Sequence, residues 1–122
     1  MRAMRLVLFA LIMCGLVFSS VLAAGDVEKG KALFDDPKAF GGTSGKSCST
    51  CHPEGKGLEK AGAMGRTDWK NPAGQWTSLE DAVNACITMA NKGNALDPKS
   101  REMKNVVAYI KSLGKKTGKK GW

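Results

Sequence analysis

The feature that most constrains this chain is Cys48-Ser49-Thr50-Cys51-His52, two cysteines separated by two residues and followed directly by a histidine. The C-x-x-C-H pattern is typical of covalent attachment of a c-type haem. Two thiols one short turn apart can each add to one of the two vinyl groups along one haem edge. The next residue, His52, would then lie close enough to bind the iron. The motif therefore predicts one covalent haem c, bound by Cys48 and Cys51, with His52 as the proximal iron ligand.

Two other kinds of site contain a pair of cysteines at this spacing: a redox-active dithiol and one half of a zinc site. A thioredoxin-like dithiol belongs within a βαβ pattern, and no strand pattern is visible in this sequence. A zinc site needs a second pair of ligands, whereas His52 is the only histidine in the chain. Both alternatives are therefore disfavoured relative to haem.

Residues 1–23 have the features of a cleaved secretory signal peptide. Arg2 and Arg5 form a basic start, residues 6–18 are apolar, and small residues precede Ala24. The competing interpretation is a retained membrane anchor, but the apolar run is shorter than the roughly 20 residues that a membrane span needs. We therefore expect a periplasmic or otherwise exported protein.

The rest of the chain predicts one small domain at residues 24–114, followed by a basic tail at residues 115–122. Without the two arginines of the predicted signal peptide, 17 basic and 11 acidic residues remain, a net charge of about +6. Export and the lack of an aromatic-plus-basic motif argue against a nucleic-acid partner. We expect this charge to favour an acidic redox partner or peripheral contact with a membrane surface. The alternative is that it only keeps the protein soluble.

The spacing of apolar residues predicts three helices, each preceded by a capping residue. The ranges, with their caps, are 26–35 (Asp26), 79–92 (Ser78) and 98–113 (Asp97). Gly93 and Gly114 are placed to end the second and third helices. Val27, Gly30 and Phe34 share one face of the first helix. In the second helix the apolar stripe is formed by Leu79, Ala82, Val83, Cys86 and Ala90.

Residues 53–77 are rich in Gly, Lys and Pro and show no clear period. A loop this long without structure is unusual in a small domain unless it wraps something. Short helices also bury little area alone. We therefore predict an all-α fold, in which three main helices and a long loop wrap around one covalent haem. Arg66, Trp69 and Trp76 are candidates either for bonds to the haem propionates or for packing within this loop.

The ligand on the other side of the iron is left open by these patterns. Cys86 and Met89 lie one turn apart on the second predicted helix, so both could face one side of the haem. Met64 lies close after His52 in the sequence, and Met103 fits the core stripe of the third helix. A lysine or an open position is also compatible with the sequence. The choice matters because a thioether ligand raises the reduction potential, whereas a thiolate lowers it.

Together these residues resemble the class I cytochrome c family over essentially all of the predicted mature chain. GDVEKGKALF looks like the N-terminal helix of that family, with Gly30 and Phe34 where it crosses the C-terminal helix. MKNVVAYIKSL looks like the partner helix, with Tyr109 in the aromatic crossing position. The resemblance implies a small cytochrome c fold, an exposed haem edge and one-electron transfer.

Residues 78–113 are also similar to the cytochrome domains of thiosulfate dehydrogenases and of the diheme subunit of the sulfur-oxidising complex. In those domains a cysteine at the place of Cys86 ligates the haem iron, so the resemblance makes Cys86 the first choice and Met89 the runner-up. Their catalytic unit has two haems, whereas this chain has one C-x-x-C-H. We therefore predict an exported monohaem electron carrier rather than an enzyme. The alternative is a haem subunit of a sulfur-compound oxidising system.

Overall fold

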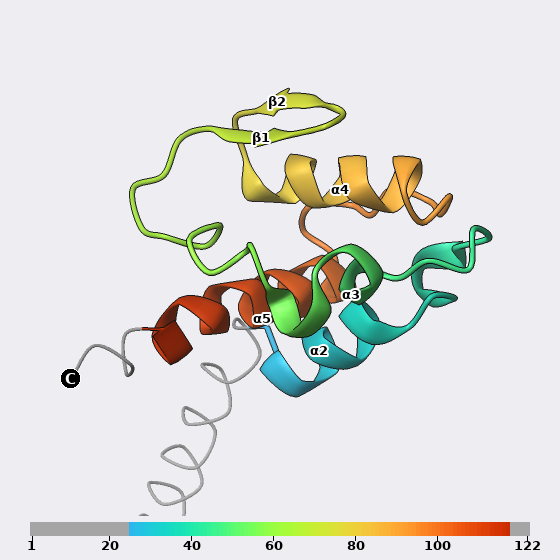
Figure 1. Ribbon diagram of the computed structural model, residues 1–122, viewed down its shortest axis with the longest axis horizontal. Coiled ribbons are helices and arrows are strands. Elements are labelled where there is room, and N and C mark those ends of the chain that lie inside the picture. Colours follow the sequence, from blue (N-terminus) through green and yellow to red (C-terminus); the bar gives the residue numbers. More distant parts are fainter. Residues whose placement is uncertain (1–24, 118–122) are drawn as a thin grey trace, which may run out of the picture.

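The computed structural model describes residues 25–117, so the predicted signal peptide and residues 118–122 lie outside the described residues. Within this range the chain is mainly helical (Figure 1). The helices are α2 (Val27–Asp35), α3 (Cys48–Cys51), α4 (Leu79–Met89) and α5 (Arg101–Thr117), with 3₁₀ turns at Ala39–Gly41 and Pro53–Gly55. The predicted helical architecture, with three longer helices, is confirmed. No helix among the described residues is both long enough and apolar enough to cross a bilayer.

The core is built where α2 crosses α5 (Figure 1). A Cβ atom on Gly30 would lie 1.9 Å from the carbonyl oxygen of Asn105, so only glycine permits this close approach. Beside it, the rings of Phe34 and Tyr109 meet edge to face with their centroids 5.0 Å apart. The crossing expected for Gly30, Phe34 and Tyr109 is therefore confirmed.

A hydrogen bond from the backbone of Asp26 joins the start of α2 to a side chain of α5. The backbone N–H of Asp26 donates to Oδ1 of the buried Asn105 at 2.8 Å. The Asp26 carboxylate accepts the N–H of Lys29 at 3.0 Å and caps the helix as predicted. Val27, which was expected on the buried face, is 39% exposed. The reason is that the backbone, rather than the Val27 side chain, makes the contact at this end.

The start of α5 differs from the prediction, since the helix begins at Arg101 rather than at residue 98. Ser100 is the residue that caps it, because its Oγ accepts the N–H of Met103 at 3.2 Å. The Asp97 carboxylate instead accepts the N–H of Lys99 at 2.8 Å and forms a separate turn. The predicted cap at Asp97 was therefore wrong.

The end of α5 also differs, because the helix continues through Gly114 to Thr117, into the predicted tail. A glycine inside a helix costs only about 1 kcal/mol relative to alanine, so it does not by itself end one. Here the missing side chain leaves space for the loop, since a Cβ on Gly114 would lie 3.1 Å from the carbonyl oxygen of Glu59.

Helix α4 begins as predicted, with Ser78 Oγ accepting the N–H of Asp81 at 3.1 Å. It ends at Met89, three residues before the predicted end, and Lys92 then adopts a left-handed conformation with φ 55°. The side chains of α4 that are buried in the core are Leu79, Val83, Ala85 and Ile87. The rest of the predicted stripe, Ala82, Cys86 and Ala90, is only half-buried.

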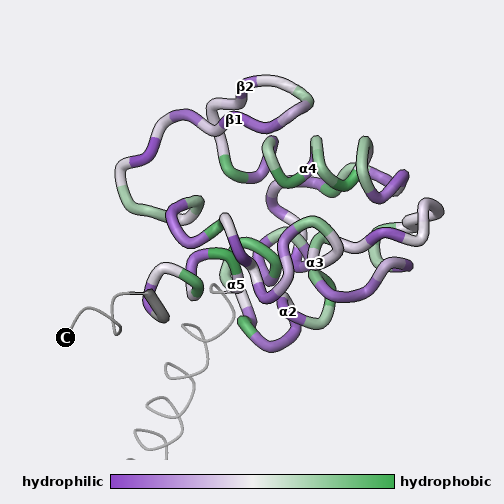
Figure 2. Tube along the Cα trace, in the orientation of Figure 1, coloured by the Kyte–Doolittle hydropathy of each residue, from purple (hydrophilic) through white to green (hydrophobic). Residues whose placement is uncertain are grey.

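The loop at residues 53–77, for which the sequence showed no strand pattern, contains a short hairpin. Strands β1 (Trp69–Asn71) and β2 (Gly74–Trp76) pair antiparallel, with Trp69 opposite Trp76. Three-residue strands are too short to show alternation of apolar and polar residues. The Asn-Pro-Ala-Gly turn between the two tryptophans was the signal available in the sequence. Figure 2 shows that α4, beside this hairpin, carries many apolar residues, whereas the loops are largely polar.

Candidate functional site

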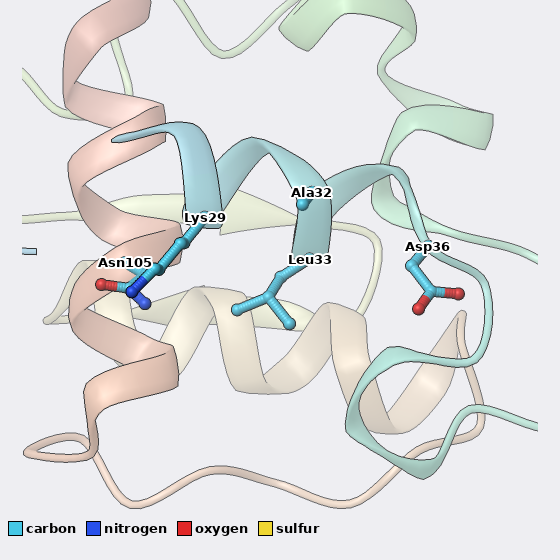
Figure 3. Close-up of a pocket in the computed structure, with 5 residues that line it drawn as sticks. All are labelled: Lys29, Ala32, Leu33, Asp36 and Asn105. Atoms are coloured by element: carbon cyan, nitrogen blue, oxygen red, sulfur yellow. The ribbon is translucent and has the colours of Figure 1, made fainter. Parts of the chain in front are cut away.

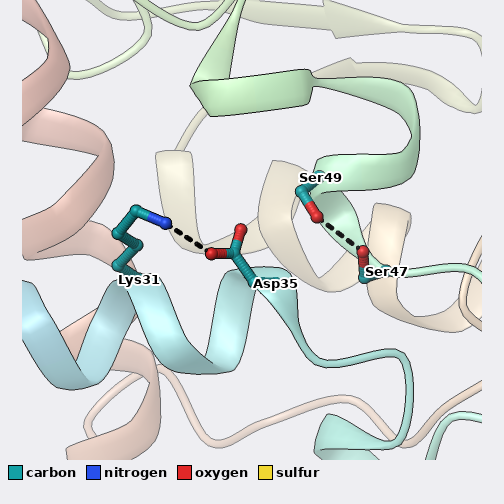
Figure 4. Close-up of polar contacts among 4 residues, drawn as sticks. All are labelled: Lys31, Asp35, Ser47 and Ser49. Carbon is teal, nitrogen blue, oxygen red and sulfur yellow. Dashed lines mark hydrogen bonds and ion pairs between the residues drawn. The ribbon is translucent and has the colours of Figure 1, made fainter.

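The two cysteines of the motif lie on the single turn of α3. Ser47 precedes this turn, and its backbone N–H donates to Thr50 Oγ1 at 2.9 Å. The hydroxyl oxygens of Ser47 and Ser49 lie 2.8 Å apart (Figure 4). Both cysteine thiols are free, with Cys48 half-buried and Cys51 exposed. The serine and threonine side chains therefore stabilise the turn that carries both thiols of the motif.

The ring of His52 is oriented by the backbone that follows it. Its Nδ1 lies 2.9 Å from the carbonyl oxygen of Lys56. Because a carbonyl only accepts hydrogen bonds, Nδ1 must carry a proton, and in the neutral ring Nε2 then has a free lone pair. Gly57 has a φ of 91°, a backbone conformation that other residues rarely adopt, and a Cβ there would make an ordinary contact with the ring, 3.5 Å from Nδ1. This is the tautomer and support that metal-binding histidines usually have.

Cys86 lies on the half-buried face of α4, within electrostatic range of the motif. Burial is the main reason that the pKa of its thiol is raised, and a charge on Cys51 raises it further. Burial likewise raises the pKa of Cys48, with a smaller contribution from a charge on Cys86. The thiols of Cys48, Cys51 and Cys86 therefore lie close enough for a charge on one to affect the pKa of another.

Two asparagine amides contact these sulfur atoms, and sequence reasoning missed both. Asn71 Nδ2 lies 3.9 Å from Cys86 Sγ, and Nδ2 of the buried Asn91 lies 3.8 Å from Cys48 Sγ. The bond from Asn71 acts to lower the pKa of Cys86, and that from Asn91 acts to lower the pKa of Cys48. Each contact joins residues far apart in the sequence, so no local pattern indicates it.

The methionines differ sharply in their surroundings. Met89 is 56% exposed at the last position of α4, and Met64 is fully exposed in the loop. Met103 is fully buried among core residues of α5, which fits the packing role that its position suggested. Of the two first candidates for the distal ligand, Cys86 is thus the one that α4 holds in a partly buried setting.

Arg66, Trp69 and Trp76 have their polar groups engaged within the loop and hairpin. Trp69 Nε1 donates to the carbonyl oxygen of Ala61 at 2.8 Å, and Trp76 Nε1 donates to Asn71 Oδ1 at 3.1 Å. Arg66 Cζ lies 5.5 Å from the centre of a Trp69 ring, and its Nε donates to a backbone carbonyl at 2.8 Å. These contacts support packing within the loop rather than bonds to propionates.

A separate open pocket lies along α2 (Figure 3). It is lined by Lys29, Ala32, Leu33, Asp36 and Asn105. On the same helix Lys31 Nζ pairs with Asp35 Oδ2 at 2.5 Å (Figure 4). None of these residues belongs to the motif or to α4, so we do not assign the pocket to the site.

The residues at the motif fit a c-type haem. Two free thiols on one turn can form two thioether bonds, and the His52 ring already exposes the lone pair that iron needs. Helix α4 adds three half-buried side chains, those of Ala82, Cys86 and Ala90. Among residues 25–117, no three or more His, Cys, Asp or Glu side chains are grouped so that they could hold a bare metal ion.

Comparison with known protein families matches residues 29–117 to the family described as SoxA/TsdA, cytochrome c domain. Searches among curated proteins and among solved structures gave no match. The family match covers most of the 122-residue chain and includes the motif, Cys86 and α5. It confirms the resemblance seen in the sequence, and it implies haem c binding and an electron-carrying role. The chain thus belongs to the SoxA/TsdA cytochrome c domain family.

Proposed function

We propose that this chain is an exported monohaem c-type cytochrome that carries single electrons between redox partners. The observation that carries the proposal is the 2.9 Å contact between His52 Nδ1 and the Lys56 carbonyl oxygen, directly after two free cysteines on one turn. A histidine prepared in this way has its Nε2 lone pair available for iron. One C-x-x-C-H in the chain supports a single haem.

In this proposal Cys48 and Cys51 hold the cofactor through thioether bonds, and His52 is the proximal ligand. The bound haem supplies an iron that exchanges one electron between the ferric and ferrous states. The chain's part is to hold the His52 ring through the Lys56 carbonyl and to exclude water from the iron with the apolar face of α4. Residues 1–23, which have the features of a secretory signal peptide, support export.

Cys86 is the proposed distal ligand, and Met89 remains the runner-up. Three features support this order: Cys86 is half-buried, it lies in the apolar stripe of α4, and it is within electrostatic range of Cys51. Met89, by contrast, is 56% exposed. An anionic thiolate stabilises ferric iron, so this choice also implies a lower reduction potential than methionine would give.

The proposal is tested by producing the full-length protein in a host that attaches haem c and measuring covalent haem per chain. We expect one haem that survives denaturation in wild type. In Cys48→Ala or Cys51→Ala one vinyl group of the haem would stay unreacted. The haem absorption would then shift towards that of a haem with free vinyl groups. Cys86→Ala is the control for covalent attachment alone, because it removes a nearby thiol and is expected to keep one covalent haem per chain. Wild-type protein without covalent haem under these conditions would overturn the proposal.

A second candidate function is a haem subunit of a sulfur-compound oxidising system, and the family match favours it. Coupling two thiosulfates removes two electrons, whereas one haem stores one. A partner would therefore have to provide a second redox centre. Thiosulfate-dependent reduction of an artificial electron acceptor, lost in Cys86→Ala and kept in Met89→Ala, would place this function above simple electron transfer.

A further inference from the structure

The β1–β2 hairpin packs against α4, and Asn71 is its link to Cys86 (Figure 1). The orientation of the Asn71 amide is set by two donors. Its Oδ1 accepts the backbone N–H of Ala73 at 2.9 Å and the indole N–H of Trp76 at 3.1 Å. Only an oxygen can accept both of these N–H groups. The oxygen of the Asn71 amide therefore faces the hairpin, and its NH₂ group faces the other way.

The other end of the amide faces α4. Asn71 Nδ2 lies 3.5 Å from the carbonyl oxygen of Ala82 and 3.9 Å from Cys86 Sγ. The two hydrogens of an amide can serve two acceptors one helical turn apart. Sulfur is larger than oxygen, which explains why the contact with Sγ is the longer one. The hairpin thus holds a donor against the sulfur of the proposed distal ligand.

We propose that Asn71 is a positioning residue for Cys86, donating a hydrogen bond that holds Sγ in place and reduces the electron density it gives to iron. The inference rests on the proposed role of Cys86 as the distal ligand. A hydrogen bond to a ligand sulfur stabilises the more electron-rich sulfur and is one of the levers that set the potential of a haem. Asn71 therefore raises the reduction potential above that of an unsupported thiolate ligand.

The test compares reduction potentials and the sulfur-to-iron charge-transfer band in haem-loaded variants. Asn71→Leu removes the donor without adding charge, and Gln75→Leu is the matched control at an exposed position on the same hairpin. One hydrogen bond worth about 1 kcal/mol changes the ferric-to-ferrous ratio roughly fivefold, a shift of about 40 mV. We expect Asn71→Leu to lower the potential by this amount and to move the band, and Gln75→Leu to change neither.

Asn71→Leu also removes the acceptor for Ala73 and Trp76, and the hairpin itself could open. Asn71→Asp keeps that acceptor but replaces the N–H donor with a carboxylate oxygen and adds a negative charge. Both changes favour ferric iron, so this variant is expected to lower the potential at least as much as Asn71→Leu and to move the band in the same direction. Unchanged values in both Asn71 variants, with the band lost in Cys86→Ala, would overturn the inference and leave Cys86 as the ligand. A band that persists in Cys86→Ala would overturn the ligand assignment as well.

Discussion

His52 illustrates how one backbone carbonyl prepares a side chain for chemistry. The contact between its Nδ1 and the Lys56 carbonyl places the proton on one nitrogen and leaves the other free. Without this contact the ring would populate both tautomers and several orientations. Restricting it to one tautomer and one orientation when a metal binds would then cost binding free energy. The motif predicts which residue binds the iron, and the carbonyl of Lys56, four residues later, orients the ring of that residue.

The identity of the distal ligand gives a prediction at the level of single residues. If Cys86 binds the iron, Cys86→Ala loses the sulfur-to-iron charge-transfer band, and its reduction potential rises because an anionic ligand has been removed. Met89→Ala is then expected to keep the wild-type spectrum. The absorption and magnetic circular dichroism spectra of the ferric proteins, with redox titrations, provide the measurement. The opposite pattern, with the band lost only in Met89→Ala, would show that methionine is the ligand.

The sequence indicated the cysteines and the histidine of the candidate site, but not the asparagine side chains that contact the cysteine sulfur atoms. Cys48, Cys51 and His52 are adjacent in the chain, so their spacing alone predicts their joint role. Asn71 and Asn91 act across 15 and 43 residues. An amide that contacts a distant sulfur has no local signature, and it becomes visible only when the hairpin and the end of α4 are packed.

At the level of elements, the starts of helices were predictable where one capping residue was available and not where two competed. Asp26 and Ser78 each cap as expected. Before α5, Asp97 and Ser100 both have the required side chain. Asp97 precedes a proline and accepts the N–H of Lys99, which leaves Ser100 to cap the helix.

This assignment predicts that Ser100→Ala destabilises the protein more than Asp97→Ala does. Loss of the bond from the Met103 N–H to Ser100 Oγ removes an N-cap, which costs about 1 kcal/mol of unfolding free energy. Asp97→Ala removes a turn contact outside the helix and is expected to cost less. Denaturant unfolding of the two haem-loaded variants gives the comparison, and an equal or reversed order would contradict the assignment.

The crossing of α2 and α5 gives a second prediction at this scale. In Gly30→Ala the added methyl group would meet the Asn105 carbonyl oxygen at 1.9 Å, so the helices must move apart and disturb the contact between Phe34 and Tyr109. Overpacking of this kind costs about 3 kcal/mol, well above the gain in helix propensity.

Thermal and denaturant unfolding of the Gly30→Ala variant measure this loss directly. Lys29→Ala serves as the control, because it changes an exposed residue of the same helix and is expected to stay within about 0.5 kcal/mol of wild type. If Gly30→Ala cost no more than this control, the close crossing would not be a requirement of the fold.

At the scale of the whole molecule, the proposed haem would account for the half-buried side chains of α4. Phe34 and Tyr109 are buried where α2 crosses α5, but Ala82, Cys86 and Ala90 of α4 are only half-buried. Apolar surface of this kind gains free energy when a large apolar group covers it. The helical class of the fold was predictable from the spacing of apolar residues, whereas the short hairpin within residues 53–77 was not.

The positive charge of the predicted mature chain is expected to affect how fast it meets a redox partner. The predicted mature chain carries a net charge of about +6, and the lysines of α5 at Lys111 and Lys115 are exposed. If these charges steer an acidic redox partner, the second-order rate of electron transfer with an acidic protein should fall steeply between low and physiological ionic strength. Lys111→Glu should lower that rate further at low salt and leave the reduction potential almost unchanged. A basic redox protein of similar potential is the control, since its rate should rise with salt. Rates with the acidic protein that are independent of salt would mean that the charge serves solubility alone.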